Sequence, residues 1–243
     1  MRMKISPLVC FAACALALAA CGPPDPALLP SAAPRPKPQP AMSQPIGTAT
    51  MRQDGTLVMR LQADTDSGAN VQPLWQVSFI NPVNGVTAVP AEDVDCPVIK
   101  PEIGIAGTPV IDAASGTLYV IAETKEPGPK YVFRLHALDV TSGAERTGSP
   151  VETTAPGFVP LVHKQRTALL LSRGEIYASW SSHCDRGDYH GWVMSYDAGT
   201  LSQSGVFNVS PDGDAGSFWN GGAGPSADDE GNVYVVSANG TFD

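Results

Sequence analysis

The densest group of side chains that could do chemistry lies in the segment Ser182–His190, which contains histidine, cysteine and aspartate at close spacing. His183, Cys184, Asp185 and His190 are all ligand types that zinc accepts. The segment has no second cysteine pair, however, and its glycine and aspartate content is typical of an ordinary loop. We therefore treat these residues as candidate metal ligands and favour the loop interpretation.

Two acidic clusters, Asp212–Asp214 and Asp228–Glu230, could attract calcium, because hard cations prefer oxygen ligands. Neither cluster has the ligand spacing of a complete calcium-binding loop. We interpret both as solvated acidic turns.

The sequence contains no Gly-x-Ser-x-Gly elbow, phosphate-binding loop or His-Glu-x-x-His helix. His136 and His163 stand apart from other reactive groups, and we interpret them as structural histidines. The four tryptophans fall on or beside expected strands, where packing is their default role: Trp75, Trp180, Trp192 and Trp219. The sequence therefore assigns no catalytic residue.

The elements that position these groups show a repeat. Gly116–Val120, Gly174–Ala178 and Gly231–Val235 each combine a turn glycine with an alternating apolar strand. Gly174 lies 58 residues after Gly116, and Gly231 lies 57 residues after Gly174. Such matching intervals indicate a repeated structural unit.

A second element closes each unit with a strand and an Asp-led turn. Asp139 begins one such turn and Asp197 begins the next, while Asp64–Gly68 has the spacing of Asp139–Gly143. Asp bonds to the backbone two residues further on, and Gly accepts positive φ, so both residue types suit tight turns between strands.

Each unit is predicted to contain four strands. The expected strands are Thr108–Asp112, Leu118–Glu123, Tyr131–Asp139 and a weaker one near Val151, then Thr167–Ser172, Glu175–Ser182, Gly191–Asp197 and Gly205–Val209. No window beyond the N-terminal segment has a helical period, and Pro and Gly recur throughout the chain. The predicted fold class is all-β, with four-stranded antiparallel units repeated radially as the blades of a β-propeller.

The turn Ala137-x-Asp139-x-x-Ser142-Gly143 resembles the tryptophan-docking motif of quinoprotein, or PQQ-like, β-propellers. The match is partial. Thr147 occupies the position of the motif's tryptophan, Leu201 replaces the glycine in the next unit, and Trp75 lies a few residues late in the first. From roughly Leu74 to Asp243 the chain also resembles bacterial PQQ-like repeat proteins, through Pro101–Asp112 and Ser182–Asp185.

The resemblance implies that Asn239 matches the position from which quinoprotein alcohol dehydrogenases supply a calcium-binding amide. The family's other ligands and its catalytic aspartate are not recognisable in this sequence. PQQ and calcium are therefore implied only under the alternative that the chain is the remnant of a PQQ-dependent dehydrogenase.

The strand count predicts an incomplete propeller over residues 46–243. Residues 46–80 supply at most three strands of a first blade, two full blades follow, and Gly222–Asp243 adds two strands. Such an arc leaves unpaired strand edges that invite association with other chains. We expect the chain to be a fragment of a longer propeller.

The N-terminus predicts export. Arg2 and Lys4 precede the apolar run Ile5–Ala20, which is too short for a permanent membrane span. The run ends in Leu18–Gly22, which resembles the bacterial lipobox and implies cleavage after residue 20 and acylation of Cys21. Acyl chains would hold the protein on a membrane. In such lipoproteins, glycine after the cysteine usually implies transport to the outer membrane.

Residues 21–45 carry proline at nearly every second or third position, so they cannot build a core and are predicted to form a disordered tether. The formal net charge is −9, and loss of Arg2 and Lys4 with the signal peptide makes it −11. An acidic chain is repelled by phosphate backbones, which argues against nucleic-acid binding.

Five cysteines are present, but Cys10 and Cys14 lie in the signal peptide and Cys21 is the expected acylation site. Cys96 and Cys184 remain, in a compartment where disulfides persist. In a propeller, the connection that carries Cys96 and the loop that carries Cys184 lie on the same face. We therefore favour a disulfide between them over a zinc site.

These observations favour a non-catalytic binding or scaffold module in the bacterial cell envelope. We expect a lipid anchor, facing the periplasm or the cell surface, and envelope protein partners that contact blade edges or loops. The alternative is the dehydrogenase remnant.

Overall fold

The computed structural model describes residues 48–51, 56–60, 75–220 and 223–241. All of them belong to one compact unit, Ile46–Asp243. The expected signal peptide, Cys21, the proline-rich tether and the turn Asp64–Gly68 lie outside the described residues. No helix in the described ranges is long and apolar enough to cross a membrane.

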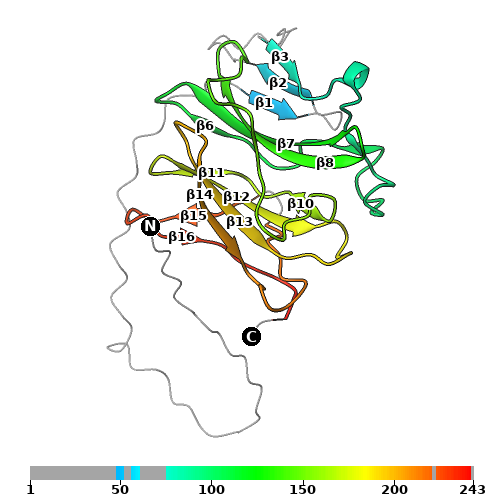
Figure 1. Cartoon of the computed structure of the whole chain (residues 1–243). Helices are drawn as coiled ribbons and strands as arrows, with labels where there is room; N and C mark the ends of the chain where they lie inside the picture. The colour runs from blue at the N-terminus through cyan, green and yellow to red at the C-terminus, as the bar shows by residue number, and fades with distance from the viewer. Residues whose placement is uncertain (1–47, 52–55, 61–74, 221–222, 242–243) are drawn as a thin grey trace, which may run out of the picture. The chain divides into compact units, whose positions relative to one another are not determined.

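The described chain is all-β and consists mainly of successive antiparallel sheets (Figure 1). The first sheet contains β1 (Thr48–Met51), β2 (Thr56–Arg60) and β3 (Trp75–Ser78). The second contains β6 (Val110–Asp112), β7 (Thr117–Glu126), β8 (Lys130–Asp139) and β9 (Val151–Glu152), in that order. The expected fold class of four-stranded antiparallel units is confirmed.

The third sheet contains β10 (His163–Gln165), β11 (Leu170–Ser172), β12 (Glu175–Ser182), β13 (Trp192–Asp197) and β14 (Gln203–Asn208). The fourth contains β15 (Ser226–Ala227) and β16 (Val233–Tyr234). Between the first and second sheets lie the 3-10 helix η2 (Pro82–Asn84) and a small pair, β4 (Val89–Pro90) and β5 (Glu102–Ile103).

The glycine repeat corresponds to one structural position. Gly116 lies between β6 and β7, Gly174 between β11 and β12, and Gly231 between β15 and β16, with φ of 62°, 79° and 89°. Only a residue without a Cβ adopts this backbone region at little cost. The regular interval therefore marks a recurring tight turn.

The second sheet is buried on both faces, because successive side chains of a strand point to opposite sides. Tyr119 and Ile121 of β7 pack in a core shared with Ile176 and Trp180 of β12. The alternate positions Leu118, Val120 and Ala122 pack in a second core with Trp75 of β3. The second sheet therefore joins the first and third sheets through two separate cores.

One strand differs from the prediction. The expected strand Thr167–Ser172 begins only at Leu170, and β10 was not predicted. Both β10 and β11 pair with β12, at opposite ends of that strand. The polar run His163-Lys164-Gln165 is fully buried there, so it lacks the alternation by which strands are recognised in a sequence.

Candidate functional site

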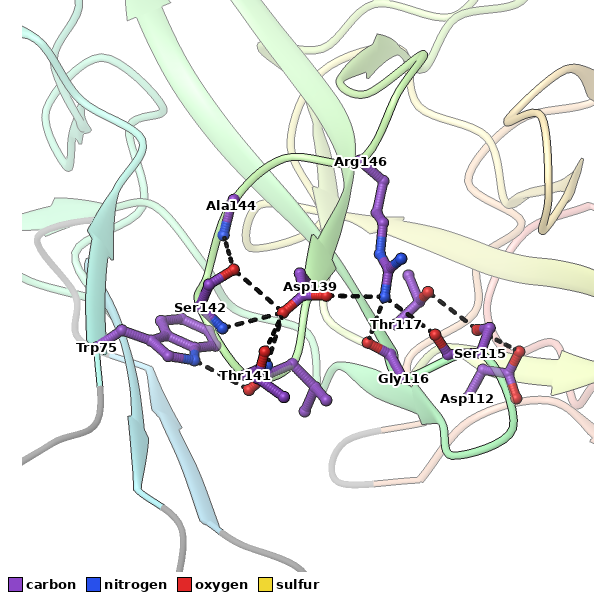
Figure 2. Close-up of polar contacts among 11 residues, drawn as sticks. Trp75, Asp112, Ser115, Gly116, Thr117, Asp139, Thr141, Ser142, Ala144 and Arg146 are labelled. Carbon is purple, nitrogen blue, oxygen red and sulfur yellow. Dashed lines mark hydrogen bonds and ion pairs between the residues drawn. The ribbon is translucent and has the colours of Figure 1, made fainter.

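The Asp-led turn after β8 uses its polar side chains to hold the structure together (Figure 2). Asp139 Oδ1 accepts hydrogen bonds from the backbone N–H groups of Thr141 and Ser142, both at 3.0 Å. Hydrogen bonds from the Thr141 side chain and backbone, and from Ser142, lower the pKa of Asp139 to about 2. Arg146 pairs with Asp139 Oδ2 at 3.0 Å and donates to the Gly116 carbonyl at 2.9 Å, which links this turn to the turn between β6 and β7.

Trp75 docks the first sheet on the same turn. Its Nε1–H donates to the Val140 carbonyl at 3.0 Å. Figure 2 shows the Trp75 ring pointing toward this turn. A Cβ on Gly143, where φ is 73°, would lie 2.6 Å from a Trp75 ring carbon. The tryptophan that lies late in the sequence motif therefore still contacts the motif's glycine, and that glycine is required for the ring to fit.

The third sheet makes an equivalent contact with different residues. Ala198 follows Asp197 as Val140 follows Asp139, and its carbonyl accepts a 2.8 Å hydrogen bond from the Tyr119 hydroxyl. Leu201 replaces the glycine, adopts a φ of 58° and is buried in the core between the second and third sheets. Where the motif lacks its tryptophan, a tyrosine supplies the donor and a leucine fills the core.

The connection 91–101 and the loop 183–191 meet at what we call the disulfide end. Cys96 and Cys184 are joined by a disulfide, with their Cα atoms 5.6 Å apart. This is the pairing that the sequence favoured over zinc. Arg186 and Asp95 form an ion pair beside it. The two segments are therefore fixed to one another at two points.

His163 has a structural role at this end. Its Nδ1 is 2.7 Å from the Val159 carbonyl, and its Nε2 accepts hydrogen bonds from Trp192 Nε1 and the His190 backbone at 3.1 and 3.2 Å. These contacts define a neutral imidazole with its proton on Nδ1. Burial lowers the pKa of His163 to about 4. The sequence did not predict the contacts of His163 with the His190 backbone N–H and the Trp192 indole.

His136, the other histidine interpreted as structural, lies on β8. Its Nδ1 is 2.6 Å from a Glu145 carboxylate oxygen, and its ring packs against the tilted Phe79 ring with 4.0 Å between centroids. Both contacts are local packing contacts next to the turn of Figure 2.

The candidate metal ligands are not gathered around one point. Asp185 Oδ1 accepts hydrogen bonds from the Tyr189 hydroxyl and from Asn239 Nδ2, both at 2.8 Å. His190 Nδ1 lies 2.9 Å from the Ser210 carbonyl, and His183 is buried. Within the described ranges, no three His, Cys, Asp or Glu side chains lie close enough together to hold a metal ion.

The side chains considered for calcium make local hydrogen bonds. Asn239 and Asp185 contact one another. In the cluster Asp228–Glu230, the Asp228 oxygens accept hydrogen bonds from the Asn232 side chain, the Tyr234 hydroxyl and two backbone N–H groups. Asp228 is therefore a turn cap, as the sequence indicated.

A cavity of about 290 Å³ opens at the disulfide end. Lys164, Arg166, Cys184, Asp185, Trp219 and Asn239 are among the residues that line it. The sequence did not predict that Lys164, Arg166 and Trp219 lie near the loop 183–191. No spacing pattern in the sequence links these residues to that loop.

No protein-family model matches the chain, and no curated protein matches it. Part of the chain is similar to solved quinoprotein structures. A europium-containing methanol dehydrogenase has 13% identity over 67% of this chain and 23% of its own, with a TM-score of 0.41. Quinohemoprotein alcohol dehydrogenases from Pseudomonas putida HK5 and Comamonas testosteroni have 15% and 16% identity over 68% of this chain, with TM-scores of 0.43 and 0.44.

The chain spans about a fifth of the length of these dehydrogenases, between 19% and 23%. Similarity at this level concerns the fold alone, and it carries no conclusion about activity, substrate or cofactor.

Proposed function

We propose that the chain is a non-catalytic binding module of the bacterial cell envelope, in which the disulfide end contacts a protein partner. The observation that carries this proposal is that the reactive groups of the disulfide end hold one another. Cys96 is bonded to Cys184, His163 is held by three hydrogen bonds, and Asp185 accepts two. Groups engaged in this way support a rigid surface better than they support proton or group transfer.

The surface that remains is suited to contact. Val98 is 76% exposed and Val159 is 49% exposed, although both are apolar. The Asp188 side chain, on the loop 183–191, is 92% exposed. Because the disulfide already orders the two segments, little conformational entropy is lost when a partner binds them.

The absence of catalysis is tested by alcohol-dependent reduction of a redox dye in the presence of PQQ and calcium. We expect no rate above the protein-free blank. A rate that needs both PQQ and calcium would support the dehydrogenase alternative and contradict the proposal.

The proposed anchor is tested separately. Cells that express the full chain are labelled with radioactive palmitate, and the chain is expected to carry label and to fractionate with membranes. The variant Cys21→Ser should lose both properties. Label that persists in Cys21→Ser would contradict anchoring through this cysteine.

A further inference from the structure

The last strand of the third sheet, β14, has an open edge. The sheet has the order β10-β12-β13-β14, and β14 pairs with β13 alone among the described strands. The Val209 N–H donates to the Gly191 carbonyl at 2.9 Å, so in the alternating pattern of an antiparallel pair Phe207 also bonds to β13. Val206 and Asn208 therefore direct their backbone N–H and C=O groups away from β13, where no backbone partner is found in the described part of the chain.

This edge lacks the features by which proteins protect an edge strand. Short length, proline and charged side chains prevent an exposed edge from pairing with another chain. β9, at the corresponding edge of the second sheet, has only two residues, follows Pro150 and has Glu152 paired with Lys130. β14 has six residues without proline or charge, and its Val206 is 42% exposed. β14 is therefore better suited than β9 to accept an added strand.

The part of the chain that contains β14 is strongly acidic. Residues 174–243 contain ten aspartate and glutamate residues and one basic residue, Arg186, which gives a formal charge of −9. Residues 1–173 contain fourteen residues of each sign and are neutral, so residues 174–243 carry the whole net charge of the chain. Such an asymmetry favours a partner of opposite charge, because complementary potentials steer association and select the partner.

Acidic side chains lie beyond both ends of β14. Asp197 caps the turn that precedes this strand, and Asp212 and Asp214 are exposed in the loop that follows it. Neither Asp212 nor Asp214 forms an ion pair with a basic side chain in the described ranges. Two carboxylates without a cation beside an open strand edge favour an added strand with basic residues at its end.

We propose that β14 accepts an extended, basic segment of a partner protein as an added strand, with an apolar side chain of that segment next to Val206 and its lysine or arginine side chains next to Asp212 and Asp214. Backbone hydrogen bonds at the edge supply affinity, and the carboxylates select the charge. A second copy of this chain is a poor occupant, because it brings the same acidic groups to the edge. The inference goes beyond the proposed function, since β14 is not part of the disulfide end.

The test uses the full chain and three fluorescently labelled synthetic peptides. The peptide KKTVTVKK has the expected chemistry, KKTVPVKK has the same charge but a proline that interrupts strand pairing, and EETVTVEE has the opposite charge. Fluorescence anisotropy should show saturable binding of KKTVTVKK alone. Hydrogen exchange should show that this peptide protects the segment 203–208.

The variant Val206→Pro tests strand addition on the protein side. Proline removes an N–H group that faces away from β13, so the pairing of β13 with β14 is retained while an added strand loses a hydrogen bond and meets the proline ring. Binding of KKTVTVKK should weaken at least tenfold, with the urea midpoint close to that of the wild type.

Two double variants test the charge. Asp212→Asn with Asp214→Asn removes the carboxylates beside β14, whereas Asp229→Asn with Glu230→Gln removes two exposed carboxylates from the turn between β15 and β16. The first should weaken binding about fivefold and the second less than about twofold, because exposed charges contribute only where they meet their partner.

Three results would overturn the proposal: no saturable binding of KKTVTVKK, equal binding of KKTVPVKK, or equal weakening by the two double variants. A dimer that sedimentation detects in the wild type and not in Val206→Pro would identify a second copy as the occupant, and it would overturn the proposal as well.

Discussion

Gly143 and Trp75 show how a single residue fixes the junction between two sheets. The variant Gly143→Ala places a methyl group 2.6 Å from the Trp75 ring at a φ of 73°. We expect a loss of about 2 to 4 kcal/mol in the free energy of unfolding, from backbone strain together with overpacking. Urea denaturation measures this loss.

The matched control is Gly174→Ala, where φ is 79° and nothing lies within 4 Å of the added carbon. This variant carries the backbone strain alone and should lose about 1 kcal/mol. Equal losses from the two variants would show that Trp75 does not press on Gly143.

His163 and His183 make stability depend on pH. Burial lowers the pKa of each to about 4, whereas an unfolded histidine has its ordinary pKa of 6.5. Between these values the unfolded state binds more protons than the native state, so stability falls as the pH falls. Between pH 7 and pH 5, each histidine should lower the free energy of unfolding by about 2 kcal/mol.

The variant His183→Leu isolates one of these two contributions. No hydrogen-bond partner for either ring nitrogen of His183 is found among the described residues, so an apolar replacement leaves no partner unsatisfied. The free energy of unfolding, measured by urea denaturation, falls between pH 7 and pH 5. This fall should be about 2 kcal/mol smaller for the variant than for the wild type. Identical pH dependence in both proteins would contradict this assignment.

For single residues, the sequence predicted the roles of Asp139, Asp197 and the three turn glycines, because local turn chemistry determines these roles. It did not predict the hydrogen bond from Tyr119 to the Ala198 carbonyl, which joins positions 79 residues apart. Contacts between sheets depend on how the units stack, and the spacing of residues within one unit carries no information about that stacking.

Among the elements, the disulfide connects the segment before the second sheet to a loop of the third. Its cysteines are 88 residues apart, so it constrains a long loop in the unfolded chain. In the chain-entropy model this constraint adds about 4 to 5 kcal/mol to the free energy of unfolding. Reduction should therefore lower the urea midpoint markedly.

The double variant Cys96→Ala with Cys184→Ala is the control for reduction. It should unfold at the midpoint of the reduced wild type, and dithiothreitol should not change its midpoint further. A midpoint near that of the oxidised wild type would mean that the bond adds little to stability.

The strands of the second and third sheets were largely predictable, because alternating apolar residues and turn glycines bound them. β12 has the predicted limits Glu175–Ser182. β10 was not predictable, since its three residues are polar and become buried only by pairing with Ser182, Ser181 and Trp180. For the same reason, the sequence did not predict that Lys164 and Arg166 lie near the loop 183–191.

In the molecule as a whole, the second sheet should be the most stable part, because β7 and β8 contribute to both principal cores. Their amide protons are expected to exchange only upon global unfolding, whereas those of β16, where Tyr234 is 56% exposed, should exchange much faster. Hydrogen exchange followed by NMR measures both. Faster exchange in β7 than in β16 would contradict this arrangement.

The disulfide end is proposed to contact a protein partner. A photoreactive amino acid placed at Val98, which is 76% exposed at the disulfide end, tests this in living cells. The matched position is Ala113, exposed in the turn after β6, at the opposite end of the second sheet. We expect a discrete cross-linked adduct from Val98 and none from Ala113, whereas no adduct from Val98, or the same adduct from both, would contradict the claim.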